Sequence, residues 1–256
     1  GWKKRRIGEV AIQTKGVVDI DNTDLTRYVA GAHMISEDIH LRKWGNVGDG
    51  YLGPAFIRRF SKGDILYGSR RTYLKKVALA DFNGITANTT FVIKANEELI
   101  EPILLVHLML SDKYVEYSVQ NSRGSVNPYI NWKDIADYEF LLPPKSEQKR
   151  LAELLWAADE MIEKEKKVLK ELKDHIQIII KENTTDTKNK RIPFSNLVEK
   201  NPTTTINTEE VSLITMPDIS EEGEIINYIK AQLKELRGKG LTPFKENDIL
   251  FAKITP

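Results

Sequence analysis

The chain has 256 residues, and 41% of them are hydrophobic, which is enough for a packed core and excludes a disordered protein. It contains no cysteine, which excludes disulfides and thiol catalysis and fits a reducing compartment. The formal net charge of +1 favours no class of partner. No apolar run reaches membrane-spanning length, and the basic start of the sequence lacks the apolar segment of a signal peptide. We therefore expect a soluble, cytoplasmic protein with no membrane partner.

The first 145 residues combine short strand patterns with turn signals and helical patterns. The predicted strands are residues 7–12, 17–20, 64–67, 76–80, 90–94 and 138–142. Those at 64–67, 76–80 and 90–94 are expected to share one sheet. Helices are predicted at 101–111 and 113–119. This order of elements predicts an α+β fold, with a globular α/β domain over residues 1–145.

A long helix is predicted from Ser146 to Asn183, directly after a double proline. Its apolar residues recur at alternating steps of four and three, a heptad pattern interrupted once by Glu165. At about 1.5 Å per residue it would be roughly 55 Å long, more than one modest domain can cover. A coiled coil, antiparallel or between molecules, is therefore favoured over a core helix. The residues assigned to helix pairing are Leu155, Ile162, Leu169, Leu172 and Ile176.

A weak internal repeat lies on the two sides of this helix. Residues 60–67 (FSKGDILY) recur as residues 244–251 (FKENDILF), with four identities and one Tyr/Phe exchange. Repeated domains carry matching elements in matching order. The sequence is therefore divided into a first domain (1–145), the spacer helix (146–183), a linker (184–191) and the start of a second, similar domain (192–256).

Catalytic motifs find little support in the sequence. The four histidines have no metal-ligand spacing, and the Walker, GxGxxG and GxSxG motifs are absent. Asn127-Pro128-Tyr129 is similar to the Asn-Pro-Pro-aromatic loop of adenine methyltransferases, but it lacks the second proline and a glycine-rich cofactor loop before it. Asp64 follows a glycine in a turn, where a solvated turn carboxylate is the common role. We expect a non-catalytic chain without a metal or cofactor of its own.

Two polar loops are the candidate contacts to nucleic acid. Residues 58–76 contain seven lysines and arginines against one acid, and residues 120–131 form a second polar loop around Gly124. Arginine binds phosphates or guanine edges with two hydrogen bonds, and asparagine suits adenine edges in the same way. The alternative for each loop is a solvated surface turn. The candidate residues are Ser69, Arg70, Arg71, Thr72, Tyr73, Lys75 and Lys76 in the first loop, and Arg123, Ser125, Asn127 and Tyr129 in the second.

Two segments carry a resemblance to a known family. Residues 63–94 (GDILYGSRRTYLKKVALADFNGITANTTFVIK) and 127–163 (NPYINWKDIADYEFLLPPKSEQKRLAELLWAADEMIE) resemble the specificity (S) subunits of Type I restriction-modification systems. The most specific part is LLPPKSEQKRLAELLWAADE, residues 141–160. The resemblance extends from about Trp2 to Asn183 and resumes within residues 191–198 and 238–256.

The resemblance implies an architecture and a set of partners. Two target recognition domains would each be followed by a long helix, and the two helices would pair antiparallel as a spacer between two DNA half-sites. The implied partners are double-stranded DNA and methylation subunits, which bind S-adenosylmethionine and methylate adenine, with a restriction subunit as a further candidate. The S subunit itself would be non-catalytic and would carry no cofactor.

Within this resemblance the two loops fall in the recognition domain. Their base or groove contacts are assigned to Arg70, Arg71, Tyr73 and Asn127, and their phosphate contacts to Lys75, Lys76 and Arg123.

The chain departs from the family pattern because it holds one domain, one helix and a short second part. The chain could be a truncated piece, the product of an interrupted reading frame or a natural half-subunit. In a half-subunit, two copies pairing through residues 146–183 would restore the two-fold arrangement and read a palindrome, since protein symmetry is mirrored in the DNA site. Two alternatives stay open at this point. The chain could be a coiled-coil assembly protein without a nucleic-acid role, or an adenine methyltransferase itself.

Overall fold

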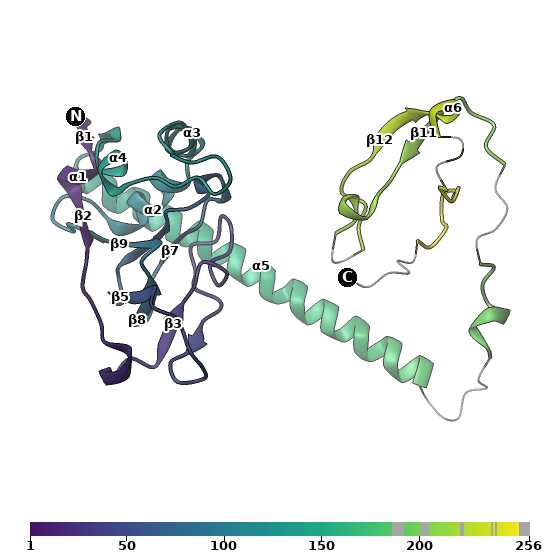
Figure 1. The fold of residues 1–256 in the computed structure, drawn as a ribbon, viewed down its shortest axis with the longest axis horizontal. Coiled ribbons are helices and arrows are strands. Elements are labelled where there is room, and N and C mark those ends of the chain that lie inside the picture. The colour runs from purple at the N-terminus through teal and green to yellow at the C-terminus, as the bar shows by residue number, and fades with distance from the viewer. Residues whose placement is uncertain (186–191, 201–204, 221–222, 237, 239, 251–256) are drawn as a thin grey trace. The chain divides into compact units, whose positions relative to one another are not determined.

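The computed structural model describes residues 1–185, 192–200, 205–220, 223–236, 238 and 240–250 (Figure 1). The chain divides into two compact units, residues 1–174 and 175–256, which are described separately. The strands of the first unit are β1 (Lys3–Arg6), β2 (Ala11–Thr14), β3 (Arg27–Val29), β4 (Gly45–Asn46), β5 (Phe56–Phe60), β6 (Ile65–Gly68), β7 (Val77–Leu79), β8 (Gly84–Ala87), β9 (Thr90–Ala95) and β10 (Glu139–Leu142). Its α-helices are α1 (Ile7–Val10), α2 (Pro102–Leu110), α3 (Asp112–Gln120), α4 (Trp132–Ala136) and α5 (Lys145–Thr185), which continues into the second unit.

The strands form two four-stranded sheets and one separate pair. One sheet has the order β2-β9-β6-β7, the other has the order β4-β3-β8-β5, and β1 pairs with β10. The main apolar core lies between the first sheet and the helices α2 and α3, and it includes Ile65, Ile93, Leu105 and Tyr114. The mixed α and β architecture that the sequence predicts is confirmed, and so is the placement of β6, β7 and β9 in one sheet.

Near the N-terminus, the strand predicted at 7–12 is confirmed only at residues 11–12, the start of β2, and the strand predicted at 17–20 is wrong. Residues 7–10 form a single helical turn, because Ile7 and Val10 are buried three residues apart and the Glu9 carboxylate accepts the Arg6 N–H at 3.3 Å. Residues 17–20 form no strand, although Val17 makes one isolated bridge to Arg58. The strands β3, β5 and β8 were not predicted, since they are short and β5 carries two arginines.

The long helix is confirmed as α5, whose 41 residues span about 60 Å at 1.5 Å each. Helix formation begins at Lys145, so Ser146 lies within the first turn. Ala152 is buried in the domain core, and Leu155 packs against the same core. Leu155 is thus partly covered by its own domain, and its assignment to helix pairing stays a prediction. The pairing residues Ile162, Leu169, Leu172 and Ile176 are all about half exposed.

Buried hydrogen bonds fix the start of α5 in the domain. The Gln148 side chain is 1% exposed. Its amide nitrogen donates to the carbonyl oxygens of Leu99 and Pro143, each at 2.9 Å, and its amide oxygen accepts the Glu101 N–H at 3.1 Å. None of these three backbone groups forms a hydrogen bond within a described helix or sheet. The Gln148 side chain therefore provides the hydrogen bonds that water would otherwise supply.

Among the described residues of the second unit, β11 (Glu210–Leu213) pairs antiparallel with β12 (Ile229–Gln232), and a short helix α6 (Leu233–Leu236) follows. It also contains a turn that matches one in the first unit. The Asp64 carboxylate accepts the Ser61 N–H at 2.7 Å, and the Asp248 carboxylate accepts the Lys245 N–H at 2.9 Å.

In both turns the residue before the aspartate has positive φ, +92° at Gly63 and +70° at Asn247. The internal repeat in the sequence thus corresponds to the same turn conformation in residues 61–64 and 245–248. Its last residue, Phe251, lies outside the described residues.

A search of the described helices for a membrane span found none that is both long and apolar enough.

Gln148→Leu is expected to lower the free energy of unfolding by about 1–3 kcal/mol for each buried backbone group left without a partner. Urea unfolding followed by circular dichroism measures this loss. The matched control is Gln120→Leu, because Gln120 is exposed and bonds only the Glu116 side chain within the part of the chain described. Equal stability of the two variants would contradict the role given to Gln148.

Candidate nucleic-acid interface

The first candidate loop connects β6 to β7 through one turn of 3-10 helix, η2 (Thr72–Leu74). Arg71 precedes this turn with φ +51°, and Lys75 follows it with φ +48°. Left-handed backbone at residues other than glycine costs free energy and is retained where surrounding contacts enforce it. The loop therefore has a backbone conformation that contacts with the rest of the domain must hold in place.

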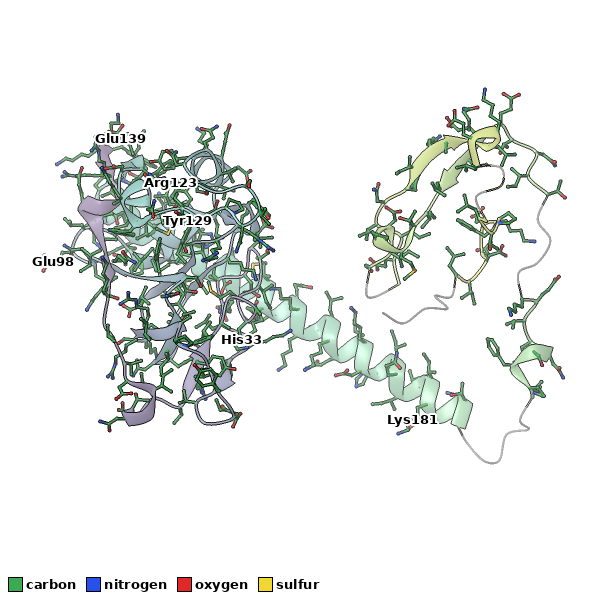
Figure 2. The ribbon with its side chains drawn as sticks, viewed as in Figure 1. His33, Glu98, Arg123, Tyr129, Glu139 and Lys181 are labelled. Atoms are coloured by element: carbon green, nitrogen blue, oxygen red, sulfur yellow. The ribbon has the colours of Figure 1, made fainter. Side chains whose placement is uncertain are left out.

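The second candidate loop lies between α3 and α4 and closes as a narrow hairpin. The Arg123 N–H donates to the Tyr129 carbonyl at 2.8 Å, and the Tyr129 N–H donates back to the Arg123 carbonyl at 2.9 Å. Figure 2 shows Arg123 and Tyr129 close together on the domain. The turn uses Gly124 at φ +91°, a conformation that favours glycine because it has no Cβ.

Backbone hydrogen bonds join the two loops into one surface. The Arg71 N–H donates to the Pro128 carbonyl at 2.7 Å, and the Ile130 N–H donates to the Ser69 carbonyl at 2.9 Å. A side-chain bond adds to them, from Arg71 Nε to Asn127 Oδ1 at 3.2 Å. Segments more than 50 residues apart therefore present their polar groups together. The sequence predicts each loop separately and does not predict the hydrogen bonds that join them.

A third segment, residues 31–37, supports the first loop and was missed in the sequence. The Ser36 hydroxyl donates to the Leu74 carbonyl at 2.6 Å, and the Glu37 N–H donates to the Lys75 carbonyl at 3.1 Å. Glu37 also has positive φ, at +59°. Three of the four non-glycine residues with positive φ among the described residues thus meet here. Only the folded backbone reveals this role, because Ser36 and Glu37 match no motif.

Most of the predicted contact residues are exposed on the joined surface. Arg70 is exposed, and its guanidinium has no hydrogen bond or ion pair with any residue that the structure describes. Tyr73 and Tyr129 are 53% and 42% exposed. Arg123 keeps only a long ion pair to Asp134, at 3.7 Å, with its side chain 62% exposed. The other exposed members are Arg71, Ser125 and Asn127.

Ser69 and Thr72 do not share this exposure. Each is 5% exposed. The Ser69 hydroxyl donates to the Thr89 carbonyl at 2.6 Å, and the Thr72 hydroxyl lies 3.5 Å from that of Ser122. Because both residues are buried, they cannot contact DNA as expected from the sequence. Their hydroxyl groups instead hold the loop in position.

The two lysines at the end of the first loop are already occupied. Lys75 Nζ lies 2.6 Å from a Glu37 carboxylate oxygen and 2.9 Å from one of Asp112. These carboxylates, Glu37 first, hold the pKa of Lys75 above its usual range. Lys76 Nζ donates to the Gly31 carbonyl at 2.6 Å. The local excess of positive charge counted in the sequence is therefore partly neutralised by acids from distant segments.

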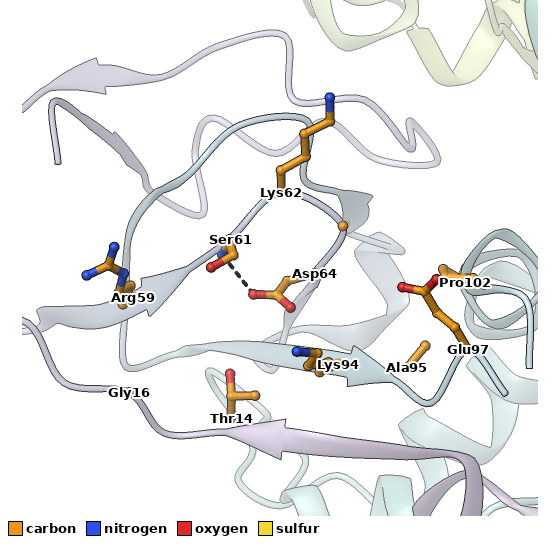
Figure 3. Close-up of a pocket in the computed structure, with 11 residues that line it drawn as sticks. Thr14, Gly16, Arg59, Ser61, Lys62, Asp64, Lys94, Ala95, Glu97 and Pro102 are labelled. Carbon is orange, nitrogen blue, oxygen red and sulfur yellow. Dashed lines mark hydrogen bonds between the residues drawn. The ribbon is translucent and has the colours of Figure 1, made fainter. Parts of the chain in front are cut away.

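A separate hollow of about 350 Å³ lies beside β9 (Figure 3). Its lining mixes cations such as Arg59 and Lys94 with the acids Asp64 and Glu97, so it has no clear preference for an anion. Asp64 is 9% exposed, and burial raises the pKa of its carboxyl. The turn role predicted for Asp64 is confirmed by its bond to the Ser61 N–H, whereas the expected solvation is wrong.

The family to which the chain belongs follows from comparison with known proteins. The family model described as "Type I restriction modification DNA specificity domain" matches residues 1–174, more than half of the chain. The chain therefore belongs to this family of DNA specificity domains.

Two curated relatives are specificity subunits. The Type I restriction enzyme EcoDI specificity subunit of Escherichia coli is 26% identical over 169 residues, covering 62% of this chain and 35% of that protein. The Type I restriction enzyme HindI specificity subunit of Haemophilus influenzae is 21% identical over 185 residues, covering 70% of this chain and 40% of that protein. The chain thus spans about two fifths or less of the length of these relatives.

Solved structures show the same fold. The HsdS subunit from Thermoanaerobacter tengcongensis matches with a TM-score of 0.56 at 22% identity, over 75% of this chain and 52% of that one. A chain from work described as "Structural basis underlying complex assembly and conformational transition of the type I R-M system" matches with a TM-score of 0.57 at 23% identity, with the same coverage.

Gly124→Ala is expected to open the second loop, because alanine is strained at φ +91° by about 1 kcal/mol or more. Hydrogen exchange at the amides of Tyr129 and Arg71 should become faster. The control is Gly48→Ala, which meets the same strain at φ +103° in a loop with no atom near the added Cβ. Unchanged exchange at both amides in the Gly124 variant would show that the glycine does not hold the junction.

Proposed function

We propose that the first unit reads one DNA half-site with the joined surface of residues 69–76 and 121–130. The observation that carries this proposal is the junction itself, which brings exposed arginine, amide and phenol groups of the two loops together on one surface. Arg70, Arg71, Tyr73 and Asn127 are assigned to bases or grooves, where a bidentate arginine or asparagine distinguishes one base pair from another. Arg123, Ser125 and Tyr129 complete the surface, with Arg123 on phosphate.

Lys75 and Lys76, which are assigned to phosphate contacts from the sequence, have a different role in this proposal. Both amino groups already bind partners within the domain, so a phosphate would have to compete with two carboxylates at Lys75 and with a carbonyl at Lys76. We assign them to holding the shape of the loop. The charge of Lys76, whose partner is a neutral carbonyl, still contributes to the field that attracts DNA at long range.

The proposed partners follow from membership of the family. The chain would direct methylation subunits, which carry S-adenosylmethionine and modify adenine, and a restriction subunit would be a further partner. The chain itself would be non-catalytic, without a metal or cofactor, and would work in the cytoplasm where its DNA is. The matching turns at Asp64 and Asp248 support residues 192–256 as the start of a second recognition domain.

The exposed apolar face of α5 supports a paired helix in the assembled protein. Ile162, Leu169, Leu172 and Ile176 follow the heptad pattern and remain about half exposed. Either a second conserved helix or α5 of another copy would cover them, and pairing of two copies would give a homodimer. The chain matches only 35% and 40% of the length of its curated relatives, and this partial match favours neither the second helix nor the homodimer.

Co-expression with a cognate methylation subunit tests the proposal, with modified adenines mapped by single-molecule sequencing. We expect a sequence motif made of two short half-sites separated by a fixed gap. A palindromic motif would mean that two copies pair through α5. Motif-free methylation by the complex, or S-adenosylmethionine binding by this chain on its own, would contradict the recognition role.

Arg70→Ala should relax specificity at one base position and weaken binding of the preferred site by about 1–3 kcal/mol. Arg123→Ala should instead weaken binding to all sequences equally and make the salt dependence shallower by about one unit of slope. Binding titrations of the methylation complex at several salt concentrations separate the two effects.

The control for both is Arg59→Ala, since Arg59 is an exposed arginine of the other sheet. Equal loss at every sequence for Arg70→Ala would remove Arg70 from the base-reading set.

A further inference from the structure

A short loop of the domain holds α5 beyond the point where the helix leaves the core. Within this loop, residues 38–42, the two terminal nitrogens of Arg42 donate to the two carboxylate oxygens of Glu163, at 2.7 and 2.6 Å. Arg42 also bonds Asp38 of its own loop. His40 Nε2 lies 3.0 and 3.1 Å from the two carboxylate oxygens of Asp159. Two side chains of the loop therefore contact two successive turns of the helix.

These contacts give the helix a second point of attachment. The first is formed by Gln148 and Ala152, which are buried in the domain. Asp159 and Glu163 follow Gln148 by 11 and 15 residues, which is about 16 and 22 Å along the axis. A rod held at one point can pivot about it, whereas a rod held at two separated points has a fixed direction.

The loop contact is built as a charge network with suitable geometry. The bidentate pair between Arg42 and Glu163 is partly buried, with both side chains 32% exposed. Lys166 adds a third charge partner, 3.2 Å from Glu163 and 3.9 Å from Asp38. The Arg42 guanidinium lowers the pKa of Glu163 to about 2, so the pair stays charged at all physiological pH values. Networks with fork-shaped arginine pairs are more persistent than isolated surface ion pairs.

The same atoms do not favour a metal. Ligand atoms of His40, Asp159 and Glu163 lie within 4.8 Å of one another. Both oxygens of Glu163 are, however, already bound by Arg42. A cation would have to displace this guanidinium, whose own charge repels it. The cluster is therefore a structural contact between loop and helix.

We propose that Arg42 is a positioning residue that fixes the direction of α5 relative to the joined loop surface and thereby sets the separation at which half-sites are read. The second half of this statement depends on the proposed function, whereas the first half does not. A tilt of about 10° at Gln148 would move Lys170, 22 residues further along, by about 6 Å. That displacement exceeds the rise of about 3.4 Å per base pair of DNA.

The direction of the helix can be measured on the free 256-residue chain by electron–electron distance spectroscopy. The sequence has no cysteine, so Lys94→Cys on β9 and Lys170→Cys on α5 introduce the only labelling sites. We expect one narrow distance distribution in the parent chain and a broad or displaced one after Arg42→Ala. Arg42→Lys, which keeps the charge but loses the fork, should broaden it to a smaller extent.

The matched control is Glu160→Ala. Glu160 forms an exposed pair with Lys164 on the same helix and has no hydrogen bond or ion pair to the described residues 38–42, so its removal should leave the distribution narrow. Circular dichroism and thermal unfolding of each variant show whether the domain and helix remain folded. A distribution that stays narrow and unshifted in folded Arg42→Ala would overturn the positioning role.

A second measurement separates this inference from the proposed function. Methylation by the assembled complex is compared on substrates whose half-sites are one base pair closer or further apart. The parent chain should support methylation at one separation, and Arg42→Ala at several. Strict spacing in the variant would refute the effect on spacing, whereas failure of the parent chain on every substrate would refute the proposed function and leave the distance measurement to decide the helix direction.

Discussion

The backbone junction between Ser69–Arg71 and Pro128–Ile130 is the interaction on which the proposed recognition surface depends. Two hydrogen bonds, from the N–H groups of Arg71 and Ile130, tie together loops that belong to different parts of the chain. Without them each loop would be a separate surface turn, and its polar side chains would have no defined spacing. With them, the guanidinium of Arg70, the amide of Asn127 and the phenol of Tyr129 share one frame. Direct readout of bases requires such a frame, because bidentate hydrogen bonds tolerate little displacement.

In the proposed function, α5 sets the separation between two half-sites only if its direction relative to the joined surface is fixed. The helix is held at two positions along its axis. At Gln148 it is held by buried hydrogen bonds, and further along it is held by ion pairs with Arg42. The buried amide enforces its position because unpaired backbone groups are costly in a dry interior. The guanidinium of Arg42 forms two parallel hydrogen bonds with the carboxylate, and this bidentate geometry fixes the orientation of the two groups as well as attracting them. Together they explain how a domain of short strands can hold a helix of about 60 Å.

The sequence predicted the parts of this molecule whose signals are local. Three strands of one sheet were found from their apolar runs, and α5 was found from its heptad pattern. The turn at Ile7 was missed, because the β-branched residues Ile7, Val10 and Ile12 favour a strand by their residue type when the Glu9 cap is not recognised. The repeat was visible in eight letters, and the matching turns at Asp64 and Asp248 give it a geometric basis.

Contacts between residues far apart in the chain explain the features that the sequence did not predict. Counting charges near Lys75 gave a basic loop, yet the acids that neutralise it come from Glu37 and Asp112. Ser69 has the chemistry of a ligand contact, and only burial shows that its hydroxyl is used within the domain. Arg42 carried no signal at all, since its partner Glu163 is 121 residues away.

Photo-crosslinking in the assembled complex tests the central claim most directly. A benzophenone amino acid replaces Val126, which is 88% exposed in the second loop, or Ile12, which is 60% exposed on β2. Crosslinks from position 126 to bases of one half-site, with none from position 12, are predicted. Crosslinks from position 12 and none from position 126 would place DNA on another face and contradict the account.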